Sequence, residues 1–158
     1  MATFQFGGID TYIKQLNKLQ VATKDDVIGK TVYAGAAVVA DKVRSNIQSL
    51  PEGKEGAAGT GAVTPAQKRG LLEGFGISKM HDEDGFVNVK LGFDGYNSVK
   101  TRKFPKGQPN VLIARAVNSG NSFRKKTKFV DKAVRASKKD AEAAMDAACS
   151  REIEKIMK

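Results

Sequence analysis

Apolar residues recur at the spacing of a helix near the start of the chain. In the segment 10–22, Ile13, Leu16 and Leu19 lie at intervals of three residues, so they share one face of an amphipathic helix. Asp10 can accept hydrogen bonds from the free amides of the first turn and is the expected N-cap. The pattern therefore predicts a helix that buries one side.

A second and longer helical pattern covers residues 27–48. Thr23 and Asp26 form a variant of the capping box at its start, and Pro51 prevents the helix from continuing. The middle of the pattern, AGAAVVA at 34–40, consists of small residues. Small side chains let a second helix or a sheet approach closely, so we expect this helix to be a packing surface.

The segment 51–64 holds four glycines and no large apolar residue other than Val63. It predicts a flexible glycine-rich loop that becomes ordered against a neighbouring subunit, because its spacing lacks the Gly-Lys-Ser/Thr ending of a phosphate-binding loop. Thr64, Pro65 and Gln67 then give the start signal of a short helix: a cap, a proline at the first position and a capping-box partner.

Alternation of apolar and polar residues replaces the helical spacing in the middle of the chain. The segment 86–93 alternates with the period of two that marks a strand with one face on a core, and 74–80 is its expected partner. The polar turn 81–85 between them ends in Asp84-Gly85, a pair that suits a tight turn. These residues predict a β-hairpin.

The last third of the chain predicts one long loop and two helices. Residues 94–109 are polar, basic and interrupted by glycine and proline, and we expect them to form a projecting basic arm. Asn110 then caps a short, buried helix over 111–118 that Gly120 ends, although VLIA within it also allows a strand. A final helix is expected over 129–158.

Together these elements predict a single α+β domain, 1–158, in which a small antiparallel β-sheet packs with two or three long helices joined by long flexible loops. No apolar run reaches the roughly 20 residues of a membrane-spanning helix. The opening MATFQFGGID lacks a basic region followed by an apolar one, so we expect no secretory signal. The single cysteine, Cys149, fits a reducing compartment such as a cytosol.

The positive charge of the chain is concentrated in one contiguous third. Of the 27 Lys and Arg, thirteen fall within 95–139 together with a single acid, Asp131, whereas the rest of the chain has fourteen basic and sixteen acidic residues. This asymmetry favours a surface for an acidic partner, either nucleic acid or protein. The alternative is a solvated basic loop that aids solubility.

Two basic clusters with neighbouring aromatic residues are the candidate partner-binding residues. Such an arrangement could follow a phosphate backbone and stack on bases, but no helix-turn-helix, zinc-finger or RNA-binding signature accompanies it. The candidates are Lys100, Arg102, Lys103, Phe104, Lys106, Arg124, Lys125, Lys126 and Lys128.

The residues supply no recognisable catalytic or metal-binding constellation. The only histidine, His81, lies in a turn beside three acids, and zinc would need further His or Cys ligands. Cys149 lies on the small-residue face of the last helix, where a free thiol is usually a packed apolar group. We therefore expect neither an enzyme nor a bound cofactor or metal.

Several sequence segments, taken in their order along the chain, resemble those of a known protein family. GGIDTYIKQLNKL (7–19) opens the chain, and KVRSNIQSLP (42–51) is followed by the glycine-rich loop and by TP…RGLLEGFGI (64–77). VLIARAVNSGNS (111–122) and KFVDKAVRAS (128–137) come last. Over most of the chain this layout resembles a family of neck and minor tail components of long-tailed bacteriophages. Two places depart from the family: Asn118 with Gly120-Asn121 replaces an acidic residue and Gly-Thr, and Lys128 replaces a proline.

The resemblance implies a structural virion protein at the head–tail junction, with a neck or tail-completion role. It implies a homo-oligomeric ring of six-fold symmetry that joins the head connector or stopper to the tail terminator or tail tube proteins, with DNA passing through. Assembly would take place in the host cytoplasm without a membrane partner. The alternative is a non-specific DNA-binding protein that uses the basic region 95–139.

Overall fold

The computed structural model describes residues 9–22, 27–53 and 59–158. The expected capping box at Thr23 and Asp26 and the centre of the glycine-rich loop, 54–58, lie outside these ranges. The elements in chain order are α1 (Ile9–Ala22), α2 (Gly29–Gln48), α3 (Pro65–Gly74), β1 (Phe75–Ile77), β2 (His81–Glu83), β3 (Phe86–Asn88), β4 (Leu91–Phe93), α4 (Asn110–Ser119) and α5 (Phe129–Met157). The predicted α+β class is confirmed.

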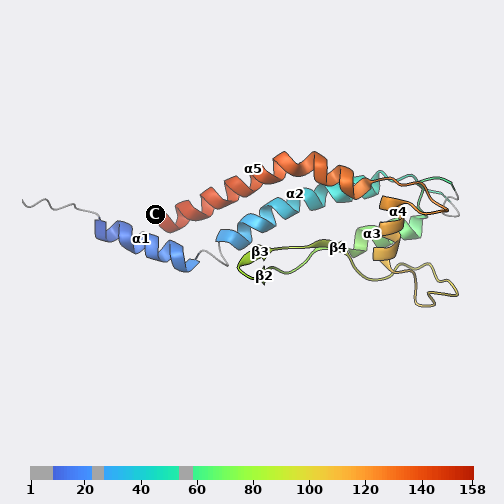
Figure 1. Cartoon of the computed structure of the whole chain (residues 1–158), viewed down its shortest axis with the longest axis horizontal. Coiled ribbons are helices and arrows are strands. Elements are labelled where there is room, and N and C mark those ends of the chain that lie inside the picture. Colours follow the sequence, from blue (N-terminus) through green and yellow to red (C-terminus); the bar gives the residue numbers. More distant parts are fainter. Residues whose placement is uncertain (1–8, 23–26, 54–58) are drawn as a thin grey trace, which may run out of the picture.

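Two long helices, α2 and α5, lie side by side and give the molecule an elongated shape (Figure 1). The helix α1 lies at the C-terminal end of α5, whereas α3, α4 and the base of the hairpin gather at the opposite end. Among the described residues, no helix combines the length and the apolar character needed to cross a bilayer.

The first helix is confirmed, although it begins at Ile9 and so includes the expected cap, Asp10. Its apolar face is not buried as expected: the side chains of Ile13 and Leu16 are 48% and 41% exposed. The reason is that, among the described elements, α1 packs mainly against the end of α5, where Gln15 Nε2 donates a hydrogen bond of 2.6 Å to the carbonyl oxygen of Met157.

The apolar core lies where the second half of α2 meets α3, α4, the hairpin base and the start of α5. Val63 of the glycine-rich segment is fully buried there. The Phe93 ring centroid lies 5.0 Å from that of Phe75 and 6.1 Å from that of Phe129, so aromatic contacts join β1, β4 and α5. Further members of this core are Ala40, Val43, Ile47, Leu50, Leu71, Ala114, Val117 and Ala133.

Away from this core, α2 and α5 pack through small side chains. Gly35 and Ala36 of α2 and Ala141 and Ala148 of α5 are all buried. A Cβ atom placed on Gly35 would lie only 2.6 Å from Met145 Cγ and 3.5 Å from the carbonyl oxygen of Ala141. The absence of a side chain at this position therefore lets α5 approach α2 closely, as the small-residue stretch predicted.

A buried carboxylate ties the far ends of the two long helices together. Glu152 of α5 accepts hydrogen bonds from Lys155 Nζ at 2.6 Å and from Lys30 Nζ of α2 at 2.8 Å. These bonds, that from Lys155 first and that from Lys30 second, lower the pKa of Glu152 from 4.5 to about 2. The Glu152 carboxylate is therefore ionised at neutral pH.

The start signal predicted for α3 is confirmed in full. Thr64 Oγ1 accepts a hydrogen bond of 3.1 Å from the backbone N–H of Gln67, and Gln67 Oε1 accepts one of 3.3 Å from the backbone N–H of Thr64. Pro65 occupies the first helical position, where its missing N–H is no loss.

The predicted hairpin is confirmed, but it forms two short sheets rather than one. The strand β1 pairs antiparallel with β4, and β2 pairs antiparallel with β3. The turn is limited to Asp84 and Gly85, whose φ angles of 53° and 86° are those of the tight turn that an Asp-Gly pair favours. The polar residues 81–83, predicted as turn, pair as a strand because this turn needs only two residues.

The helix α4 is confirmed, and it excludes the strand alternative over 111–114. The predicted N-cap is wrong: Pro109 occupies that position without a side-chain bond, and Asn110 Nδ2 instead donates a hydrogen bond of 2.8 Å to the carbonyl oxygen of Asp94. Gly120 follows the helix with a φ of 77°, which suits a residue without Cβ.

The close approach at Gly35 predicts a strong effect of a larger side chain. Gly35→Val would push against Met145 and should lower the free energy of unfolding by about 1–3 kcal/mol, measured by urea denaturation. Ala37→Val, on the exposed side of the same helix, is the matched control for the lower helix propensity of valine. Equal losses for both variants would show that the contact with α5 does not limit the side chain at position 35.

The ion pairs of Glu152 predict a pH dependence of stability. Because the pKa of Glu152 is about 2 in the folded protein, its contribution is fully present above about pH 4.5 and is lost as the pH falls towards 2. Glu152→Gln should therefore destabilise the protein at neutral pH, and its difference from wild type should shrink across that window in thermal unfolding. The exposed neighbour Glu154, changed to Gln, is the control for the loss of one carboxylate from α5.

Candidate functional site

The basic arm, 94–109, is fixed at its base by polar contacts. Tyr96 and Pro109 pair as an antiparallel bridge, and the amide of the buried Asn97 donates a hydrogen bond of 2.9 Å to the Gln108 carbonyl oxygen. Gly107 has a φ of 116°, and a Cβ atom there would collide with the Asn97 carbonyl oxygen. Glycine at this position therefore lets the two sides of the arm close.

Beyond this base the arm extends away from α3 and α4 (Figure 1). Thr101 and Phe104 exchange backbone hydrogen bonds of 3.1 and 3.0 Å, which close a turn at its end. Phe104 is half-buried, and Lys103 Nζ lies 5.7 Å from the centroid of its ring. The four cations of the arm, all exposed, are Lys100, Arg102, Lys103 and Lys106.

Gln67 connects the arm to the second basic cluster. Its Nε2 donates a hydrogen bond of 3.0 Å to Gln108 Oε1 at the base of the arm. Its Oε1 accepts a hydrogen bond of 3.1 Å from Arg124 Nη2, in addition to the bond from the Thr64 amide. One buried side chain thus organises the start of α3, the arm and the segment before α5.

The second cluster divides into one half-buried cation and three exposed ones. Burial lowers the pKa of Arg124 below its usual value, and its guanidinium serves the contact with Gln67. Lys125, Lys126 and Lys128 are exposed. The nine candidate residues are eight cations and Phe104. Arg124 among them makes a structural contact with Gln67. The other eight lie at the same end of the molecule, on the arm and on the segment before α5 (Figure 1).

Apolar side chains near the arm complete this surface; the sequence placed Tyr96 and Phe123 beside the basic clusters, but it did not identify Val111 and Leu112 as exposed. Val111 and Leu112 open α4, just after the arm, and are 54% and 46% exposed, although the helix was expected to be buried. Tyr96, at the base of the arm, is 64% exposed, and Phe123 is 75% exposed. The sequence contains one indication of this exposure: the four consecutive apolar residues at 111–114 cannot all lie on one face of a helix, so some of them must point away from the core.

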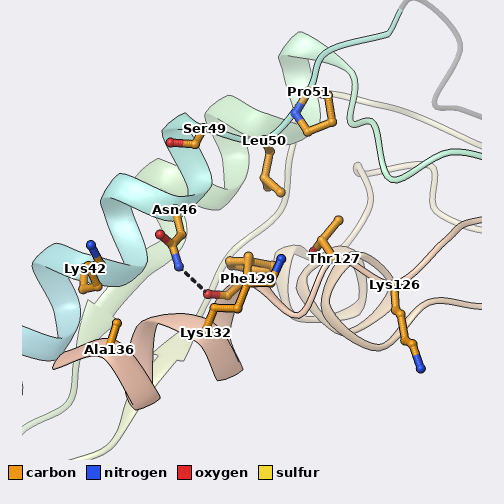
Figure 2. A pocket seen from close by; sticks show the side chains of 10 residues that line it. All are labelled: Lys42, Asn46, Ser49, Leu50, Pro51, Lys126, Thr127, Phe129, Lys132 and Ala136. Atoms are coloured by element: carbon orange, nitrogen blue, oxygen red, sulfur yellow. Dashed lines mark hydrogen bonds between the residues drawn. The ribbon is translucent and has the colours of Figure 1, made fainter. Parts of the chain in front are cut away.

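A pocket of about 440 Å³ opens between the end of α2 and the start of α5 (Figure 2). Asn46 Nδ2 crosses it to donate a hydrogen bond of 2.8 Å to the Phe129 carbonyl oxygen. Three of the lining residues, Lys42, Lys126 and Lys132, are basic and none is acidic. Within the described part of the chain these three lysines form no ion pair.

Comparisons of the chain with protein-family models, with curated proteins and with solved structures find no match. The interpretation of this surface therefore depends on its geometry and on the layout of the sequence.

The candidate metal ligands do not converge in the described ranges. His81 lies exposed on β2 and Cys149 lies half-buried on α5. No group of three or more His, Cys, Asp or Glu side chains in residues 9–22, 27–53 and 59–158 is placed to hold a metal ion.

The three contacts of Gln67 predict that its loss loosens the arm. Gln67→Ala removes the capping-box partner and leaves Arg124 without its acceptor, so unfolding should become easier by about 1–2 kcal/mol. Trypsin should then cleave faster after Lys100, Arg102 and Lys103, measured by mass spectrometry over time. Gln48→Ala, at an exposed position of α2, is the control. Unchanged cleavage in the Gln67 variant would mean that the arm is held by its own base alone.

Proposed function

We propose that the chain is a structural protein of the virion, located at the head–tail junction of a long-tailed bacteriophage in a neck or tail-completion role. It forms a homo-oligomeric ring, a hexamer, that joins the head connector or stopper to the tail terminator or tail tube proteins. The proposal assigns it no catalytic step, cofactor or metal. It is made in the host cytoplasm and becomes part of the particle.

The observation that carries the proposal is the combination of charge and apolar surface at one end of the molecule. Four exposed cations of the arm lie beyond a firmly bonded base, and exposed Tyr96, Val111 and Leu112 adjoin that base. Protein interfaces commonly place aromatic and aliphatic side chains within a polar rim. The resemblance to neck and minor tail components supports the same reading from the sequence.

Non-specific DNA binding by 95–139 is the second candidate, favoured by the thirteen basic residues of this region. Two observations weigh against it as the main role. Phe104 is half-buried under Lys103 and is less available to stack on a base than the exposed Tyr96 and Phe123, and the exposed Val111 and Leu112 of α4 offer nothing to a phosphate backbone. In a ring through which DNA passes, a strongly basic lumen would also retain the DNA. We therefore expect most of the basic residues to face protein.

The proposal predicts that the arm is needed to join heads to tails. Particles assembled with Lys100, Arg102, Lys103 and Lys106 all changed to Glu should accumulate as filled heads and separate tails in electron micrographs, because the arm would then repel an acidic partner surface. The same charge change at the exposed Lys14, Lys18, Lys79 and Lys158, all outside 95–139, is the control. Normal joining by the arm variant would contradict the proposed role of the arm.

Light scattering of the purified chain separates the two candidate functions. A ring that forms without DNA, or a monomer that assembles only on purified connectors, would support the virion role. A change of mass that requires DNA and disappears at higher salt would support DNA binding, since release of counterions makes phosphate contacts sensitive to salt.

A further inference from the structure

The pocket between α2 and α5 is suited to an occupant that is both acidic and apolar. Its three lysines, Lys42, Lys126 and Lys132, have no acidic partner within the described residues, and the acids next to two of them in sequence are engaged elsewhere. Asp41 pairs with Arg44 at 3.4 Å, and Asp131 Oδ2 lies 3.4 Å from Asn118 Nδ2. Leu50, Pro51 and Phe129 supply apolar lining. A carboxylate that approaches lysines without acidic partners is stabilised by them.

The same chain carries such an occupant at the tip of its hairpin. Asp82, Glu83 and Asp84 lie together there and are exposed, and the side chain of Phe86, just after the turn, is 77% exposed. Asp82 Oδ1 accepts a hydrogen bond from the Gly85 amide, and Glu83 binds Lys90 Nζ at 2.9 Å. The turn is therefore well formed, and it presents acidic groups and an aromatic ring together.

The tip cannot reach the pocket of its own molecule. Tyr33 Oη donates a hydrogen bond of 3.2 Å to the Ser78 carbonyl oxygen, which holds the hairpin beside the first half of α2. The pocket begins at Lys42 and centres near Asn46, thirteen residues further along the helix than Tyr33, or about 20 Å at 1.5 Å per residue. Figure 1 shows β2 and β3 beside the first half of α2, away from the start of α5.

We infer that the acidic tip at 82–86 of one copy docks into the lysine-lined pocket of a second copy of this chain. Phe86 contacts the apolar lining, and the carboxylate of Asp84 lies among the lysines. The tip and the pocket are different surfaces, and each copy carries both. The tip of one copy can therefore bind the pocket of the next, and the contact repeats from copy to copy. The inference rests on the proposed ring and deepens it by naming the contact between subunits.

A charge exchange tests the contact on the full chain. Asp84→Lys and Lys132→Glu, both at exposed positions, should each lower the association constant of the wild-type chain about tenfold, because each places like charges in contact. Phe86→Ser should lower it similarly by removing the apolar anchor. The chain that carries both Asp84→Lys and Lys132→Glu should recover most of the loss, since the opposite charges are restored with exchanged sides.

Sedimentation velocity at low and at high ionic strength gives the association constants, and Asp146→Lys, an exposed acid of α5, is the control for net charge. Retained association in the single variants, or a double variant weaker than either, would overturn the tip–pocket contact and leave the ring proposal standing. A wild-type chain that is monomeric at every concentration, and stays so on purified connectors, would overturn the contact and the proposed ring together.

Discussion

The close approach of α2 and α5 determines where the rest of the molecule lies. Small residues along both helices let them pack closely, and Gly35 leaves the room that the Met145 side chain of α5 occupies. Two long helices held in this way form an elongated body with two different ends. At one end the small side chains give way to Val43, Ile47 and Phe129, and a core forms that can hold α3, α4 and the hairpin base. At the other end the contact finishes in the polar group around Glu152, and of the described elements α1 packs against the end of α5 while β2 and β3 lie beside the first half of α2.

This division explains why the exposed cations gather where they do. The core end anchors the arm and the segment before α5, and it does so with hydrogen bonds as much as with apolar contacts. Gln67 is the clearest case, because one side chain serves the start of α3, the base of the arm and Arg124. A loop fixed at its base and free at its end can present charge to a partner with little loss of conformational entropy on binding.

Features set by neighbouring residues could be predicted from the sequence, and those set by distant contacts could not. The capping box at Thr64 and the Asp84-Gly85 turn follow from local chemistry, and each was predicted. The stripe on α1 has the spacing of a buried face, but burial depends on a partner, and the end of α5 covers little of it. Asn110 has the chemistry of a cap, yet a carbonyl of the arm competes for its side chain. The pocket joins Lys42 to Lys126 and Lys132, which no local pattern brings together.

The shape and the charge distribution together bear on the kind of assembly that such a chain can form. A two-fold pair that matched basic end to basic end would bring the cations of 95–139 against each other, and like charges in contact oppose association. Contacts between unlike surfaces avoid this, because the acidic tip of the hairpin lies away from the lysines that flank α2 and α5. Unlike surfaces that pair head to tail generate either a closed ring or an open filament, depending on whether the rotation closes. The asymmetry first visible as a basic third of the sequence is therefore, in three dimensions, a directional property, and it favours contacts between unlike surfaces over a pairing of the two basic ends.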